Sequence, residues 1–238
     1  MPLQTLVLVR HGESVQNIGE SRRRCSHCYR DEEDRRQVGV NSDQLISLSE
    51  KGLEQARRAG EALRDNFGRF NLIVNSGYVR TRQTTAGILD AYTPDYKLSA
   101  PIWETPLIRE REPGLIYFWT EAEVQRHFPW FWEYWDNADI LYRVAPAGES
   151  LLEMSTTRLP LFLRELGDRT SYLPAGARVL IVSHSRAIQG LRSVLEGWSY
   201  ERFRDEVANH YPPNGSVTVY NRDQLQDRWQ LDFANKVF

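Results

Sequence analysis

The chain contains little cysteine and little imbalance of charge. Only 2 of its 238 residues are cysteines, too few for a disulfide framework, so we expect a protein of the reducing cytoplasm. The formal net charge is −2. With this balance the chain lacks the excess of basic residues that is typical of proteins that bind nucleic acid or an acidic membrane surface.

Long hydrophobic runs are missing as well. No apolar stretch reaches the length of a transmembrane helix. The N-terminus leads straight into a predicted strand and lacks the charged start and cleavable apolar stretch of a secretory signal. We therefore expect neither a membrane segment nor secretion.

The chain does contain apolar strands that alternate with helical patterns. Strands are predicted near residues 4–9, 70–75, 178–183 and 216–220, with weaker ones near 97–102 and 228–232. Helices are predicted near residues 49–67, 80–91, 149–167 and 185–196. This alternation favours an α/β fold with a mostly parallel sheet and helices on both of its faces. No repeat or linker divides the 238 residues, a length that suits one domain.

The end of the first strand is the most informative segment. Four apolar residues are followed there by Arg10, His11 and Gly12. In open α/β folds, ligands bind at the carboxyl edge of the sheet, where glycine lets the backbone come close to a ligand. Arginine suits phosphate, and histidine can attack or relay protons. For an isolated pair, however, the favoured interpretation is a histidine satisfied by its neighbours.

Two further segments repeat this design. A second apolar strand ends on His184 and is followed by a helix, and the strand at 70–75 leads into a helix that starts near Arg80. Because the carboxyl ends of parallel strands meet at one edge, we expect His11, His184 and Arg80 over one crevice. Helix N-termini and arginines both favour an anion, so the crevice is predicted to bind one.

The ordered set of segments resembles the histidine phosphatase superfamily, in its phosphoglycerate mutase-like branch. The motifs that carry the resemblance are Arg10-His11-Gly12-Glu13-Ser14 with Asn17, Leu48–Ala56, Ser76–Ala86, Ile108–Gly114, Gly148–Leu151, Val182–His184 and Pro213–Val217. The resemblance implies a three-layer sandwich with one antiparallel strand, in a single domain of residues 1–238. It also implies a small, partly helical cap built from insertions at about 18–45 and 103–148.

The resemblance further implies a role for each site residue. The catalytic residues would be His11, Glu110 and His184, and the phosphate would be bound by Arg10, Asn17, Arg80 and Ser185. His11 must be neutral to attack, and the two arginines lower its pKa by disfavouring a third positive charge. Attack would give a phosphohistidine, while Glu110 protonates the leaving oxygen and later takes a proton from water. Because the cations are built in, we expect no metal and no cofactor.

Some of these positions have competitors. Arg82 lies near Arg80, but it should leave the start of the helix on another face. Glu112 competes with Glu110 and could instead form a surface ion pair with a neighbouring arginine. Ser14 suits a turn as well as a ligand position. Ser150 and Glu153, by contrast, fit a structural capping box.

The first insertion combines basic, cysteine and acidic residues. Arg22-Arg23-Arg24 precede Cys25 and Cys28, and a run of mixed charge follows at residues 31–36. A zinc site needs four ligands, and no second Cys or His pair occurs at suitable spacing. We therefore expect a solvated loop of mixed charge. Alternatively, its arginines could contact further negative groups of a substrate.

The second insertion is rich in aromatic residues, at positions 117–119 and 128–135. Such side chains bury large areas, and we expect them to pack the cap onto the sheet or to form the face of a homodimer. The functional alternative is an apolar wall for the leaving group of a substrate bulkier than phosphoglycerate.

Three functions remain open: a phosphatase for a small-molecule phosphomonoester, a mutase that returns the phosphoryl group to its substrate, and a non-catalytic binding module. The complete set of site residues argues against the binding module. Glu112 and Pro113 occupy positions where mutases of this type have a histidine and an aromatic residue, and the mutases' Gly-Trp segment is missing. We therefore expect a metal-independent phosphatase.

Overall fold

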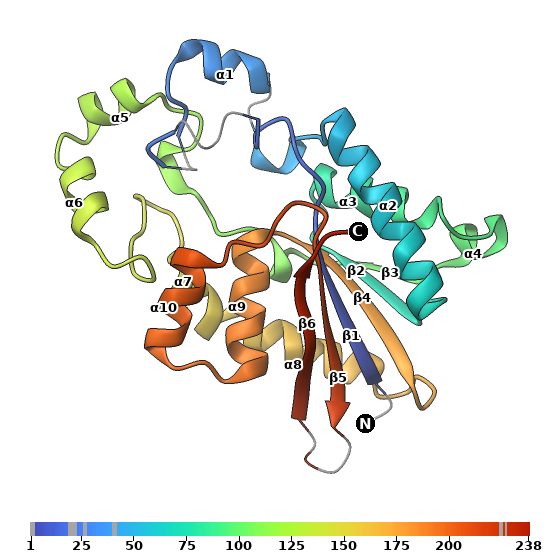
Figure 1. The fold of residues 1–238 in the computed structure, drawn as a ribbon. Coiled ribbons are helices and arrows are strands. Elements are labelled where there is room, and N and C mark those ends of the chain that lie inside the picture. The colour runs from blue at the N-terminus through green and yellow to red at the C-terminus, as the bar shows by residue number, and fades with distance from the viewer. Residues whose placement is uncertain (1–2, 19–22, 26–27, 40–41, 224–225, 227) are drawn as a thin grey trace.

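The computed structural model describes residues 3–18, 23–25, 28–39, 42–223, 226 and 228–238. Within these ranges the chain folds around a six-stranded sheet of order β3-β2-β4-β1-β5-β6 (Figure 1). The strands are β1 (Leu3–Arg10), β2 (Leu72–Asn75), β3 (Ile102–Glu104), β4 (Ala177–Ser183), β5 (Val217–Asp223) and β6 (Arg228–Lys236). β3, β2, β4 and β1 run parallel, and β5 runs opposite to both of its neighbours. The predicted fold is confirmed.

Successive side chains of a strand point to opposite faces of the sheet, so each central strand contributes apolar residues to both faces. In β1, Leu6 and Leu8 enter one hydrophobic core, and Val7 and Val9 enter the other. The first core contains residues of α7 (Leu151–Thr156), α8 (Arg158–Thr170), α9 (Ser185–Glu196) and α10 (Tyr200–Asn209). The second contains residues of α2 (Glu50–Phe67), α3 (Val79–Leu89) and α4 (Pro94–Ser99). The central strands are therefore buried on both sides, which explains their continuous apolar sequence.

Two predicted elements were wrong in detail. The predicted strand at 97–102 is mostly the helix α4, which begins with proline at its first position after Thr93, and β3 starts only at Ile102. The predicted helix at 149–167 is two helices that break at Thr157. Pro160 explains the break, because its ring would clash with the carbonyl group four residues earlier in a continuous helix. The capping box of Ser150 and Glu153 is confirmed at the start of α7.

The two insertions form the cap, which lies beyond the carboxyl ends of the parallel strands (Figure 1). Its helices are α1 (Glu32–Val38), α5 (Glu121–His127) and α6 (Phe131–Asn137), with 3₁₀ turns η2 (Asp43–Leu45), η3 (Pro106–Ile108) and η4 (Gly114–Ile116) around it. Backbone hydrogen bonds join the insertions, because the Tyr29 amide donates to the Trp119 carbonyl at 2.8 Å and the Glu121 amide donates to the Tyr29 carbonyl at 2.8 Å.

The aromatic residues give the cap a core of its own. Phe131, Trp132 and Trp135 are buried together with Cys25 and Cys28 of the first insertion. The expectation that they pack the cap onto the sheet is therefore wrong, since they pack one insertion against the other. The Cys25 and Cys28 sulfur atoms lie 3.2 Å apart as thiols. The contact with Cys25 and burial raise the pKa of the Cys28 thiol.

The charged residues of the first insertion also pair within the cap. Arg23 forms a buried ion pair with Asp34 at 2.6 Å, and Arg24 pairs with Asp136 of the second insertion. The run of mixed charge is partly the helix α1 rather than a solvated loop. Neither arginine lines the pocket described below, so the suggestion that they contact a substrate is not supported. Arg22 and His27 lie outside the described residues.

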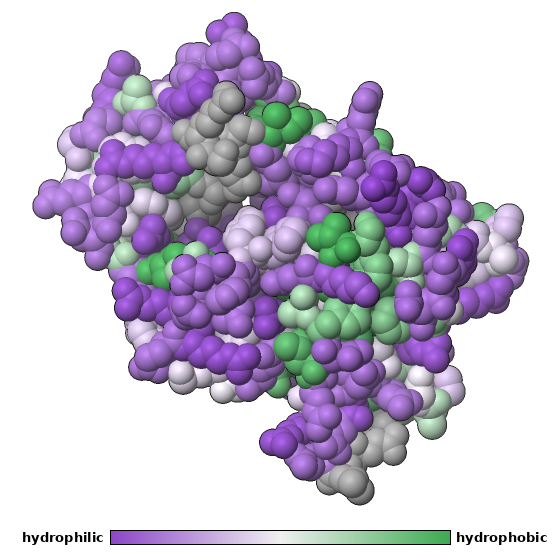
Figure 2. Space-filling view, in the orientation of Figure 1, coloured by the Kyte–Doolittle hydropathy of each residue, from purple (hydrophilic) through white to green (hydrophobic). Residues whose placement is uncertain are grey.

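Most of the face shown in Figure 2 is hydrophilic, and hydrophobic side chains gather on it mainly near the C-terminus. Of the helices that the structure describes, none has the length and apolar character needed to cross a membrane.

Candidate active site

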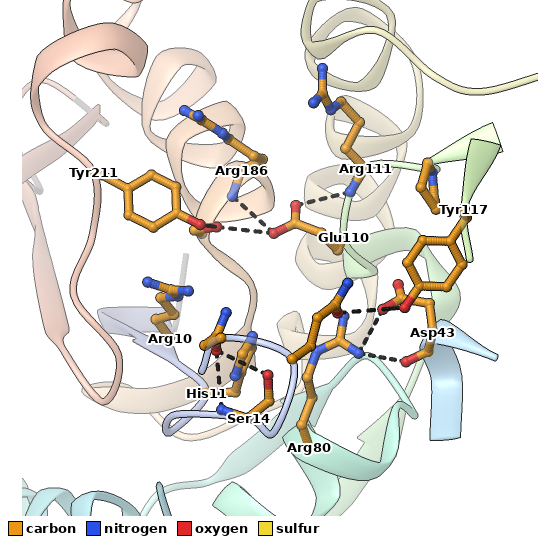
Figure 3. A pocket seen from close by; sticks show the side chains of 14 residues that line it. Arg10, His11, Ser14, Asp43, Arg80, Glu110, Arg111, Tyr117, Arg186 and Tyr211 are labelled. Carbon is orange, nitrogen blue, oxygen red and sulfur yellow. Dashed lines mark hydrogen bonds and ion pairs between the residues drawn. The ribbon is translucent and has the colours of Figure 1, made fainter. Parts of the chain in front are cut away.

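A pocket of about 130 Å³ opens at the carboxyl edge of the parallel strands. Of the seven predicted site residues, the six that line it are Arg10, His11, Asn17, Arg80, Glu110 and Ser185. The seventh, His184, is fully buried and lies behind this surface, with its ring centroid 5.1 Å from that of His11. The structure therefore brings all seven together from four separate segments of the chain. Figure 3 shows Arg10, His11, Arg80 and Glu110 around the pocket.

Strand register places the two histidines side by side. Arg10 at the end of β1 pairs with Ser183 at the end of β4, so His11 and His184 are the next residues along both strands. The His11 amide donates to the Ser183 carbonyl at 2.9 Å. Gly12 then permits a close approach, because a Cβ there would lie 2.2 Å from the carbonyl oxygen of Gly52 in α2.

His11 is a neutral imidazole with a defined tautomer. Its Nδ1 lies 2.7 Å from the Gly12 carbonyl oxygen, and because a carbonyl only accepts, Nδ1 carries the proton. Burial lowers the pKa of His11 well below its ordinary value, and the positive charges of Arg80 and Arg10 lower it further. The lone pair is therefore on Nε2, the nitrogen that can act as a nucleophile.

His184 is held by a chain of hydroxyl groups. Its Nε2 lies 2.8 Å from Ser76 Oγ, which lies 3.0 Å from Thr81 Oγ1, and Thr81 donates to the Tyr78 carbonyl. Each hydroxyl must donate onward, so Nε2 of His184 carries the proton. Consistently, Arg80 Nε donates to Nδ1 at 3.3 Å. Burial, Arg80 and His11 lower the pKa of His184 well below its ordinary value.

The two predicted phosphate-binding arginines are buried and held in place. Arg80 forms an ion pair with Asp43 at 2.9 Å and donates to the Asp43 carbonyl at 2.5 Å. Arg10 donates through Nη1 to the Pro212 carbonyl at 2.7 Å and stacks on the Tyr211 ring. The Nε of Arg10 is buried with no hydrogen-bond partner among the described residues, a donor that a bound anion would satisfy.

Asn17 is fixed by its amide oxygen. That oxygen accepts hydrogen bonds from the amide and hydroxyl groups of Ser14 and from the side chain of Asn214. The amide nitrogen is therefore the only part of Asn17 suited to an anion. Ser14 has the turn role that the sequence left open, although it also lines the pocket.

Glu110 lies at the N-terminus of α9. Its Oε2 accepts hydrogen bonds from Ser185 Oγ at 3.1 Å and from the Arg186 amide at 3.3 Å, and its Oε1 accepts one from the Arg111 amide at 2.9 Å. The buried guanidinium of Arg158 donates to the Glu110 carbonyl and forms an ion pair with Glu149. These contacts fix the backbone at Glu110. The hydroxyl of Ser185 thus orients Glu110.

The two competing residues lie outside the pocket. Arg82 pairs with Glu104 at 2.5 Å on the exposed side of α3, so it leaves the helix on another face as expected. Glu112 lies 3.8 Å from Arg109 in a surface ion pair and does not line the pocket.

Five residues that line the pocket were not predicted from the sequence: Gln16, Asp43, Arg111, Arg186 and Tyr211. Arg111 directly follows Glu110, and Arg186 follows Ser185, so their place beside motif residues was a usable signal. Asp43 lies in the first insertion, and Tyr211 lies in a loop after α10, a helix that was not predicted. No sequence motif indicates either residue.

The buried neutral histidines predict a pH dependence of stability. Because the pKa values of His11 and His184 are lowered on folding, the unfolded chain binds more protons below its ordinary histidine pKa of 6.5. The free energy of unfolding should therefore be highest above pH 6.5 and should decrease as the pH is lowered below that value. Each histidine contributes a slope of about 1.4 kcal/mol per pH unit.

Urea unfolding at a series of pH values between about 6.5 and 5 tests this expectation, because carboxylates titrate mainly below that range. A His184→Gln variant should show a shallower slope than the parent chain. A parent stability that does not change across this range would contradict the assignment of both histidines as neutral.

Comparison with known proteins agrees with this geometry. The family model of the histidine phosphatase superfamily (branch 1) matches residues 6–236. A 2,3-bisphosphoglycerate-dependent phosphoglycerate mutase of Methylobacterium radiotolerans is 30% identical over 233 residues, which cover 92% of this chain and 94% of the relative. A mutase of the same name from Rhizobium etli is 29% identical over 224 residues, covering 92% of this chain and 90% of the relative.

Solved structures of phosphatases share the fold. An alpha-ribazole phosphatase from Shigella flexneri matches with a TM-score of 0.71 at 21% identity, over 98% of this chain and 96% of that chain. A mycobacterial glucosyl-3-phosphoglycerate phosphatase matches with a TM-score of 0.67 at 22% identity, over 98% of this chain and 99% of that chain. Since the family model spans almost the entire sequence, this protein belongs to the histidine phosphatase superfamily.

Proposed function

We propose that the protein is a metal-independent phosphatase that hydrolyses a small-molecule phosphomonoester through a phosphohistidine on His11. The observation that carries this proposal is the state of His11. It is neutral, its Nδ1 proton is donated to a carbonyl, which leaves the lone pair on Nε2, and the residue lines a pocket together with Arg10, Arg80 and Glu110.

The first step transfers the phosphoryl group to the enzyme. The lone pair of His11 Nε2 attacks phosphorus, and the bond between phosphorus and the ester oxygen breaks as Glu110 gives that oxygen its proton. In the second step, Glu110 takes a proton from water, whose oxygen attacks phosphorus. The P–N bond then breaks, and inorganic phosphate leaves a neutral His11.

Charge compensation comes from side chains in this proposal. A phosphomonoester repels anionic nucleophiles, and its transfer depends on positioning and on neutralising the equatorial oxygens. Arg10, Arg80 and Asn17 are held by contacts with the protein, so their donors are already oriented before substrate binds. Each donor of this kind contributes about 3–4 kcal/mol to lowering the barrier. We therefore propose no metal cofactor.

The second candidate function is phosphoryl transfer back to the substrate. It is favoured by the names of the relatives that are 30% and 29% identical, which are phosphoglycerate mutases. The two functions differ only in whether water or a substrate hydroxyl receives the phosphoryl group from His11. The departures at Glu112 and Pro113 favour water.

The proposal is tested by incubating the purified chain in EDTA with a panel of sugar phosphates, phosphoglycerates, phosphoamino acids and nucleotides. We expect stoichiometric release of inorganic phosphate from at least one of them. Formation of a phosphate isomer without free phosphate would instead establish the mutase. Loss of activity in EDTA that a metal restores would contradict metal independence.

We place the activity in the cytoplasm, because two thiols suit a reducing compartment.

A further inference from the structure

Tyr211 lines the pocket but takes no part in the two steps proposed for phosphate release. It lies in the loop that follows α10, and the guanidinium groups of Arg10 and Arg186 lie over its ring, at 4.7 and 4.9 Å from the ring centroid. Figure 3 shows its hydroxyl group pointing toward the carboxyl group of Glu110. The Tyr211 side chain is 42% exposed, so these contacts, rather than burial, hold it in one orientation.

The Tyr211 hydroxyl is connected to Glu110 through Ser185. Ser185 Oγ lies 2.8 Å from Tyr211 Oη and 3.1 Å from Glu110 Oε2. A hydroxyl group has one proton, so Ser185 donates to only one of these two oxygens at a time. A carboxylate only accepts, whereas a tyrosine hydroxyl also donates. When Glu110 is ionised, all three groups are satisfied in one direction only, with Tyr211 donating to Ser185 and Ser185 donating to Glu110.

These hydrogen bonds also determine which oxygen of Glu110 can carry a proton. Each oxygen of a carboxylate has two lone pairs. Both lone pairs of Oε2 are used, because Oε2 accepts from Ser185 Oγ and from the Arg186 amide at 3.3 Å. Among the described residues, Oε1 accepts a hydrogen bond only from the Arg111 amide, at 2.9 Å. One lone pair of Oε1 is therefore open to a proton.

We propose that Tyr211 is a positioning residue that, through Ser185, keeps the transferable proton of Glu110 on Oε1. This inference rests on the proposed function, in which Glu110 acts first as an acid and then as a base. In the first step the O–H bond at Oε1 breaks as the ester oxygen takes the proton. In the second step Oε1 takes a proton from the attacking water. Tyr211 and Ser185 keep their own protons throughout.

Removal of the Tyr211 hydroxyl would leave the direction of the hydrogen bonds open. Ser185 can then also accept a proton that Glu110 carries on Oε2. A proton in that position is shared with Ser185 and is not delivered to the ester oxygen, so a fraction of Glu110 would be inactive as an acid. The loss should be largest for esters whose leaving oxygen needs a proton.

A comparison of two classes of ester tests the role of Tyr211. The two substrates are p-nitrophenyl phosphate, whose leaving group needs no acid, and the best aliphatic ester among the sugar phosphates, phosphoglycerates and phosphoserine. In Tyr211→Phe, the ratio of kcat/KM for the aliphatic ester to that for p-nitrophenyl phosphate should fall by about fivefold or more, the factor that one hydrogen bond typically contributes. The affinity for inorganic phosphate should change by less than about twofold, because the ring over which Arg10 lies is retained.

A double-mutant cycle tests whether Tyr211 acts through Ser185. Ser185→Ala should lower the same ratio at least as much as Tyr211→Phe, because Oε2 loses its hydroxyl donor. Adding Tyr211→Phe to Ser185→Ala should then change the ratio by less than about twofold, since residues of one hydrogen-bond network do not act additively. Tyr172→Phe is the matched control. Tyr172 is exposed and lies outside the pocket, so this variant should keep the ratio of the parent chain.

A ratio that Tyr211→Phe leaves unchanged, whether both rates fall equally or neither falls, would overturn the inference. Effects that multiply in the double variant would overturn it as well, because Tyr211 would then act independently of Ser185. A failure of the proposed function would look different: the parent chain itself would release no phosphate from either ester, and this outcome would overturn both proposals.

Discussion

Replacement of His11 by alanine is expected to lower kcat/KM for phosphate release by at least about 10⁴-fold, because the variant loses the atom that accepts the phosphoryl group. The arginines remain, so the variant should still bind inorganic phosphate. Stopped assays of phosphate release and titration of phosphate into the variant measure the two effects separately.

His210→Ala is the matched control. His210 is exposed and lies 3.8 Å from Asp205, away from the pocket. It should keep the activity of the parent chain within about twofold, as expected for surface substitutions. A folded His11→Ala chain that keeps more than a small fraction of the parent activity would show that another group, or water itself, attacks phosphorus.

Replacement of Glu110 by glutamine is expected to act selectively. For alkyl phosphates, kcat/KM should fall by about 10²–10⁴-fold, since the alkoxide would leave without a proton. For p-nitrophenyl phosphate the decrease should stay within about tenfold, because that leaving group needs no acid. Glutamine keeps the shape of the side chain, and its single amide oxygen can still accept from the Ser185 hydroxyl and the Arg186 amide, although its amide nitrogen cannot accept from the Arg111 amide.

The dependence on leaving group separates acid catalysis from simple positioning. A merely structural role for Glu110 would lower kcat/KM equally for both classes of ester, and that outcome would contradict the assignment. Glu112→Gln provides the control, because Glu112 lies two residues along the same segment and pairs with Arg109 outside the pocket. This variant should leave the ratio of the two specificity constants unchanged.

The sequence was sufficient to predict the sheet edge, and the reason is local. Continuous apolar runs end abruptly on Arg10-His11 and on His184, and such runs are typical of strands that are buried on both faces, as in a mostly parallel sheet covered by helices. Register then follows from hydrophobic burial and pairs Arg10 with Ser183. The positions of His11, His184 and Arg80 could therefore be predicted from strand ends.

The cap and the charge partners could not be predicted in the same way. Asp43, which pairs with Arg80, lies in an insertion whose path depends on contacts with another insertion. The sequence did not indicate which part of the protein the aromatic residues would pack against, so their packing against Cys25 and Cys28 is seen only in the structure. Helices α1 and α6 are seven residues long, too short for periodicity to distinguish them from loops.

The central claim is that a phosphoryl group resides on Nε2 of His11 during turnover. Rapid quenching in alkali of the chain mixed with ³²P-labelled substrate tests it most directly, because phosphohistidine survives alkali and is lost in acid. We predict an alkali-stable, acid-labile label that maps to the peptide containing His11 and is missing from the His11→Ala chain. Label on another residue, or turnover by the parent chain with no trapped label at any quench time, would contradict the account.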